Sequence, residues 1–121
     1  MNRQQVEIWI DTFKNAWVSK NIELILDIFS ETEEYCESPF TEPFTKIWEI
    51  EKCWLEINYQ NNMVLDINIL AIESENVILH WYFSYQDSRD NTTYTMDGVY
   101  QLKFNSKSKC CYFKQWWVLK E

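Results

Sequence analysis

The chain carries one histidine, His80, and acidic side chains that could exchange a proton with it. Because an imidazole changes its charge near neutral pH, a histidine beside a carboxylate can move a proton in a pocket. Asp97 or Glu37 could supply the carboxylate. The candidate catalytic residues are His80 and Asp97. Each has a simpler interpretation: His80 can lie on a surface or at an interface, and the Asp97 carboxylate can bond backbone groups beside Gly98. No spacing typical of a base and its orienting group is visible.

The four cysteines do not form a metal-binding pattern. Cys36, Cys53, Cys110 and Cys111 contain no CxxC pair, and the chain has no second histidine. In a reducing compartment such thiols are most simply buried, small, apolar side chains. We therefore expect neither a metal site nor a cofactor.

A glutamine stands on an otherwise apolar strand face near the C-terminal end. Gln115 alternates with Phe113 and Trp117. A buried amide needs hydrogen-bond partners, so Gln115 indicates either an internal partner or a ligand. Aromatic walls with a few polar groups suit apolar or ring-shaped ligands. The residues predicted to line such a cavity are Tyr35, Glu37, Trp54, Tyr59, Tyr100, Gln115 and Trp117. Alternatively, the aromatic residues among them simply fill the interior.

Composition limits the partners of this chain. Its 121 residues suit a single domain over residues 1–121, and 17% aromatic residues indicate a packed interior. A net charge of -8 repels nucleic acid and anionic lipid, so neither is expected as a partner. No apolar run is long enough to span a membrane, and the first residues carry charge where a signal peptide is apolar. A cytoplasmic location is the expectation.

Three helices are predicted in the first half of the chain. Apolar residues recur at intervals of three and four over residues 3–20, and Asn21 can cap a second, shorter helix ending near Phe29. Both prolines lie in residues 38–44, SPFTEPF, which must form an extended loop. Thr45 can cap a third helix. Its apolar side is formed by Ile47, Ile50, Trp54 and Ile57.

After Asn62 the apolar period changes to two, which predicts strands. Residues 65–71 and 77–85 alternate, and residues 35–38 form a brief earlier strand. Residues 96–104 and 110–119 form a last hairpin around the polar turn NSKSK. Because the connections are short, the sheet is expected to be antiparallel with helices on one side. The fold class is α+β.

A turn at residues 105–108 sets the expected register of the last hairpin. It pairs Tyr100 with Phe113 and places Gln115 opposite Gly98, the only glycine, where the sheet is expected to curl. Cys111 then faces inward. The opposite face is too apolar for a fully solvated surface and is expected to meet another copy of the chain. Its residues include Tyr112, Trp116 and Val118.

Several segments together resemble the nuclear transport factor 2-like superfamily in its bacterial SnoaL-like branch. Within that branch they are most similar to a group of uncharacterised proteins. The resemblance runs through the helix NIELILDIF, the loop SPFTEPF, and the strands HWYFSY, MDGVYQLKF and CCYFKQWW. It implies a cone: a strongly curved antiparallel sheet wrapped around the three helices, with a cavity at its open end and commonly a dimer through the sheet. Where these relatives tend to carry Arg-Glu, this chain has Lys114 and Gln115, so the cavity loses one carboxylate.

Two functions follow as expectations. One is a domain that binds a small apolar or aromatic molecule in its cavity, either as an enzyme of the isomerase, cyclase or hydratase kind or without catalysis. The other is an interaction or dimerisation module that uses the outer sheet face.

Overall fold

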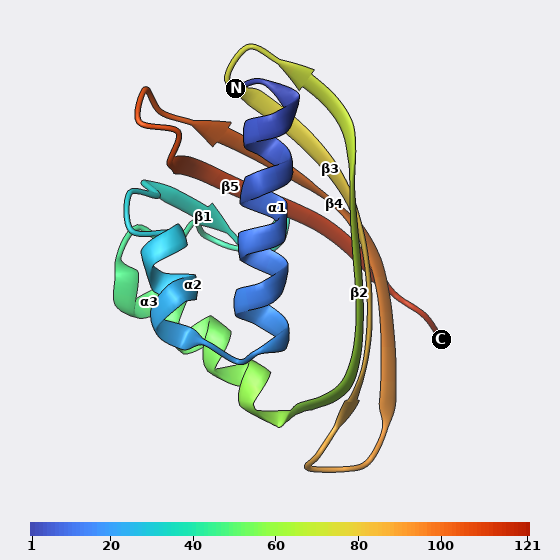
Figure 1. Cartoon of the computed structure of the whole chain (residues 1–121). Coiled ribbons are helices and arrows are strands. Elements are labelled where there is room, and N and C mark those ends of the chain that lie inside the picture. The colour runs from blue at the N-terminus through green and yellow to red at the C-terminus, as the bar shows by residue number, and fades with distance from the viewer.

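The computed structural model describes all 121 residues and has an α+β architecture. Three helices lie on the concave side of a curled, open sheet (Figure 1). The predicted fold class is confirmed, including the cone-like curvature around helices of the N-terminal half. The elements are α1 (Arg3–Val18), α2 (Ile22–Ile28), β1 (Glu34–Cys36), α3 (Ile47–Trp54), the 3-10 turn η1 (Leu55–Tyr59), β2 (Gln60–Glu73), β3 (Asn76–Asp87), β4 (Thr93–Phe104) and β5 (Cys110–Leu119).

Local signals explain the first two helices. Asn2 and Gln5 form a capping box at the start of α1: the Gln5 N–H donates to Asn2 Oδ1, and the Asn2 N–H donates to Gln5 Oε1. The side chain of Asn21 accepts from the Leu24 N–H at the start of α2, as predicted. Apolar residues at helical spacing then bury one face of α1 against the sheet.

The third helix differs from its prediction at both ends. It begins at Ile47, and the Glu49 carboxylate, rather than the side chain of Thr45, accepts the free backbone N–H groups before its first turn. The helix ends at Trp54 and continues as η1, with Ile57 buried there. Ile47 is exposed because it lies at the first helical position, beyond the buried face.

The strand order is β1-β5-β4-β3-β2. The four long strands are antiparallel, as expected, whereas β1 runs parallel to β5 at the sheet edge. The antiparallel sheet predicted for the four long strands is confirmed, and β1 adds a short parallel strand at its edge. A long connection that includes α3 separates β1 from β2 in the chain. Because no hairpin joins β1 to its neighbour β5, the two strands are free to run parallel. None of the helices is long and apolar enough to cross a membrane.

The last hairpin is shifted by two residues from its predicted register. Tyr100 pairs with Gln115, and Gly98 pairs with Trp117. An irregularity beside Phe104 places Cys110, rather than Cys111, in the core. Since a shift of two residues preserves the alternation, Gln115 still faces inward.

Gly98 lies where two other groups come close to the strand. A Cβ atom at this position would collide with the Trp116 carbonyl oxygen and would lie 2.8 Å from the Trp81 ring. The glycine is thus required by space, which is one of the roles expected for a glycine inside a strand. It allows the Trp81 indole to lie flat against β4.

Aromatic rings fill much of the interior. The Phe13 ring lies at its centre, 5.6 Å from the Trp54 ring, 5.8 Å from that of Phe29 and 6.0 Å from that of Tyr100, with near-perpendicular planes. This cluster joins α1, α2, α3 and β4. Two of its members, Trp54 and Tyr100, also line the pocket beside it.

Candidate functional site

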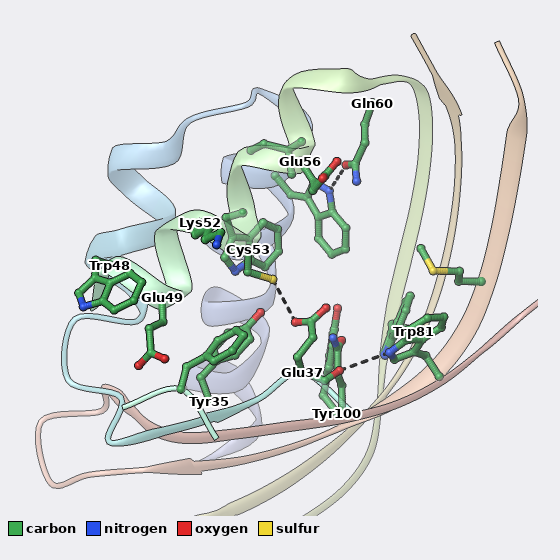
Figure 2. Close-up of a pocket in the computed structure, with 17 residues that line it drawn as sticks. Tyr35, Glu37, Trp48, Glu49, Lys52, Cys53, Glu56, Gln60, Trp81 and Tyr100 are labelled. Atoms are coloured by element: carbon green, nitrogen blue, oxygen red, sulfur yellow. Dashed lines mark hydrogen bonds between the residues drawn. The ribbon is translucent and has the colours of Figure 1, made fainter. Parts of the chain in front are cut away.

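The main pocket has a volume of about 660 Å³ and lies between the helices and the concave face of the sheet (Figure 2). Side chains from α1, β1 and the loop after it, α3, η1 and strands β2 to β5 surround it. Its lining residues are Trp17, Tyr35, Glu37, Phe44, Trp48, Glu49, Lys52, Cys53, Trp54, Glu56, Ile57, Gln60, Trp81, Met96, Tyr100, Gln115 and Trp117.

Six of the seven residues predicted to bind a ligand line this pocket, while Tyr59 does not. The six are Tyr35, Glu37, Trp54, Tyr100, Gln115 and Trp117. Tyr59 is exposed, and its ring lies 4.1 Å below the Arg89 guanidinium carbon. The prediction that Tyr59 lines the cavity was wrong, because Tyr59 ends η1 and its ring packs against Arg89 outside the pocket. Ligand binding by the other six stays a prediction.

Glu37 is the acidic group of the pocket interior. It follows β1 directly, so the pairing of β1 with β5 carries it into the pocket. The Cys53 thiol donates to Glu37 Oε2 over 3.1 Å, and the Trp117 Nε1–H donates to the Glu37 carbonyl oxygen over 3.3 Å. Burial raises the pKa of the Glu37 carboxyl, and hydrogen bonding from Cys53 and Gln115 opposes part of that rise.

Two tyrosines form the wall beside this carboxyl. Tyr35 and Tyr100 are almost wholly buried, and burial followed by the nearby Glu37 charge raises the pKa of both phenols well above the ordinary value. Both hydroxyls are therefore neutral at physiological pH and act as hydrogen-bonding groups rather than bases. The Tyr35 ring stacks on Phe113 with centroids 4.6 Å apart, which fixes its position.

Sequence reasoning missed several residues of the pocket. Cys53 has no motif around it, and only its contact with Glu37, from a different element, shows its role. Gln60 accepts a hydrogen bond of 2.8 Å from Trp17 Nε1 and ties β2 to α1 at the pocket. Trp81 belongs to the strand predicted over residues 77–85, but its position in the pocket depends on the space that Gly98 leaves. Helical spacing from Trp54 is the signal that could have indicated the neighbouring α3 residues.

His80 and Asp97 lie together but outside the pocket. His80 Nε2 is 3.0 Å from both Asp97 carboxylate oxygens, on adjacent strands. His80 alternates with Trp81, whose side chain faces the pocket, so the pair lies on the outer sheet face. More than a third of each side chain is exposed. The pair meets no group of the pocket, which separates it from Glu37 and favours the surface interpretation of His80.

The cysteines are all free, and no cluster of three or more His, Cys, Asp or Glu side chains could hold a metal ion. Burial raises the pKa of the Cys53 thiol, and the Glu37 charge raises it further. Cys53 is therefore a neutral thiol that donates a hydrogen bond rather than a nucleophile. The chemistry available in the pocket is proton exchange at Glu37 beside neutral hydrogen-bonding groups.

Replacing Glu37 with glutamine is expected to stabilise the folded protein at neutral pH. The pKa of Glu37 lies above its ordinary value of 4.5, so the folded state holds this proton more tightly than the unfolded state. The resulting stabilisation is complete below the unfolded pKa and is lost as the pH rises through the folded pKa. The difference in melting temperature between Glu37→Gln and the unchanged protein should therefore grow with pH over this interval.

The control for this measurement is Glu51→Gln, which neutralises an exposed α3 carboxylate that does not line the pocket. Its melting temperature should follow that of the unchanged protein at every pH. Two results would contradict a raised pKa at Glu37: a Glu37→Gln variant that is less stable than the unchanged protein at neutral pH, or a difference in melting temperature that does not change with pH.

Comparison with known proteins places the fold. No protein-family model and no curated protein matches this chain. Among solved structures, the epoxide hydrolase/cyclase-like enzyme SalBIII of salinomycin pyran ring formation superposes with a TM-score of 0.80 at 11% identity, covering 96% of this chain and 92% of SalBIII.

Two further structures have the same architecture. An NTF2-like protein of unknown function from Exiguobacterium sp. 255-15 has a TM-score of 0.67 at 12% identity, with 97% of this chain and 98% of that one covered. A ketosteroid isomerase-like protein from Erwinia carotovora atroseptica SCRI1043 has a TM-score of 0.71 at 8% identity, with 100% and 99% covered. This chain therefore has the NTF2-like, ketosteroid isomerase-like fold that its resemblance predicted.

Proposed function

We propose that this protein binds a small molecule with an apolar or aromatic body in the pocket and exchanges a proton with it through Glu37. The observation that carries the proposal is a partly buried carboxyl that lies among aromatic walls and whose pKa is raised by burial. A carboxyl whose pKa is raised by burial can act as an acid while protonated and as a base once ionised. Isomerisation, cyclisation and hydration are reactions that such a group supports.

The dimensions of the pocket support a ligand of moderate size. A volume of about 660 Å³ lies within the roughly 300–1,000 Å³ typical of small-molecule sites. Eleven of its 17 lining residues are hydrophobic, and its few polar groups, including Gln115, are placed to orient a ligand. The likeness to SalBIII and to a ketosteroid isomerase-like protein agrees with this chemistry at the level of the fold, which hosts more than one function.

A thermal-shift screen of hydrophobic and steroid-like ligands tests this function. We expect at least one class to raise the melting temperature and to quench tryptophan fluorescence, since five tryptophans line the pocket. For a ligand that is converted, Glu37→Gln should lower kcat by about 10²- to 10⁴-fold, the usual share of acid–base catalysis. The control Glu51→Gln should leave both kcat and KM unchanged. Absence of stabilisation by every class would contradict the proposal.

We also propose that two copies of the chain associate through the outer sheet face. The observation that favours this is an uncovered apolar surface: Trp116 is 38% exposed and Val118 is 69% exposed, with Tyr112 half-buried on the same strand. The helices cover only the opposite face (Figure 1). Such an interface would leave the pocket accessible, so association and ligand binding are compatible. A partner-binding module without catalysis is the alternative function that this surface supports.

A further inference from the structure

Glu37 is a carboxylate without a cationic partner in the interior of an aromatic pocket (Figure 2). It belongs to none of the ion pairs of the protein, and its closest side-chain partner is the neutral Cys53 thiol. An ionised carboxylate removed from water costs free energy unless an opposite charge or several donors compensate it. The protein supplies few donors and no opposite charge at this position.

Three other charged side chains, Glu49, Lys52 and Glu56, also line the pocket, and the two carboxylates among them are already engaged. Glu56 accepts a 2.6 Å ion-pair hydrogen bond from Arg89. Glu49 accepts two backbone N–H groups at the start of α3. Lys52 is exposed and forms no ion pair. Among the carboxylates that line the pocket, Glu37 is therefore the one held neither by an ion pair nor by backbone N–H groups.

The walls around this charge are suited to a cation. Trp54, Trp81 and Trp117 contribute indole rings to the lining, whereas the rings of Tyr35 and Tyr100 already stack on Phe113 and Trp81, respectively. The face of such a ring attracts an ammonium group within about 6 Å, most strongly where water is excluded. The net charge of -8 favours the approach of cations over anions.

We infer that the pocket selects molecules with a cationic amine on an aromatic or apolar body, and that the ammonium group pairs with the Glu37 carboxylate between the rings. This inference rests on the proposed small-molecule function and specifies the class of ligand. The amine supplies the missing counter-charge, and the body of the ligand fills the aromatic part of the pocket. The bound ammonium group favours the ionised form of Glu37.

The test uses three ligands of one shape that differ in charge: 2-(1-naphthyl)ethylamine, 2-(1-naphthyl)ethanol and 3-(1-naphthyl)propionate. Their affinities for the full chain are measured by calorimetry near pH 8, where the amine is still protonated. We expect the amine to bind at least about tenfold more tightly than the alcohol, and the carboxylate to bind most weakly. Glu37→Gln should remove the preference for the amine and leave the affinity for the alcohol unchanged. Glu51→Gln should preserve the order of all three.

The outcomes separate this inference from the proposed function. If the alcohol binds as tightly as the amine, or if the preference survives in Glu37→Gln, the cationic selectivity is wrong while small-molecule binding stands. If none of the three binds, and the thermal-shift screen also finds no ligand, both proposals are overturned. If none binds but the screen finds a neutral or anionic ligand, only the cationic selectivity is overturned.

Discussion

Replacing Gly98 with alanine is expected to lower the free energy of unfolding by about 3 kcal/mol, at the upper end of the usual cost of overpacking. The added methyl group would meet the Trp116 carbonyl oxygen on the neighbouring strand and the Trp81 ring. A backbone carbonyl in a sheet cannot rotate away, so β4 and β5 must separate locally or Trp81 must leave its place. Urea denaturation followed by circular dichroism measures the loss.

The same substitution is expected to disturb the pocket. Trp81 lines it and stacks on Tyr100 with centroids 5.3 Å apart. A displaced Trp81 would therefore change the pocket wall as well as the stability. Gln101→Ala, on the outer face of the same strand, is the matched control and should change the free energy of unfolding by less than about 0.5 kcal/mol. Equal denaturation midpoints for Gly98→Ala and the unchanged protein would refute the close approach of the Trp116 carbonyl oxygen and the Trp81 ring to Gly98.

Replacing Trp116 with glutamate is expected to convert the proposed homodimer into a monomer. In the interface the indole would be buried against the partner, and a carboxylate in its place would lose that contact and require desolvation. A cost of about 3 kcal/mol or more corresponds to a dissociation constant raised at least about 100-fold. Light scattering should then give a mass of 14.8 kDa for the variant and twice that value for the unchanged protein.

Trp48→Glu is the matched control for this experiment. It makes the same chemical change at an exposed tryptophan of α3, at the pocket rather than on the outer sheet face. Its mass should remain that of the dimer. A monomeric unchanged protein, or a Trp116→Glu variant that keeps the mass of the dimer, would show that this face is not the interface.

Local pattern predicted the faces of the last hairpin but not its register. The alternation of Phe113, Gln115 and Trp117 requires these side chains to share a face whatever the turn. Their partners on β4 depend on the irregularity beside Phe104, which moved Gln115 from Gly98 to Tyr100. A strand bulge depends on the turn and on packing over many residues, so the apolar pattern does not predict it.

The candidate site shows the same division. Six predicted lining residues could be found because an aromatic or polar residue on an inward face has few other places to lie. Tyr59, by contrast, ends η1 and packs against the Arg89 guanidinium group outside the pocket. His80 was a candidate by residue type alone, and its strand places it on the outer face. Residue type alone made His80 a candidate for proton transfer, but the sheet face on which it lies excludes it from the pocket and leaves Glu37 there.

By itself, the sequence determined the helices, the long strands and the side of each strand that is buried, because apolar periodicity and capping residues act over a few neighbouring positions. Only the tertiary structure decided that β1 runs parallel to β5. This pairing brings Glu37 to Cys53 on α3 and to Gln115 on β5. The position of the pocket carboxyl thus depends on contacts between segments far apart in the chain, where loop closure and packing, rather than local pattern, select the arrangement.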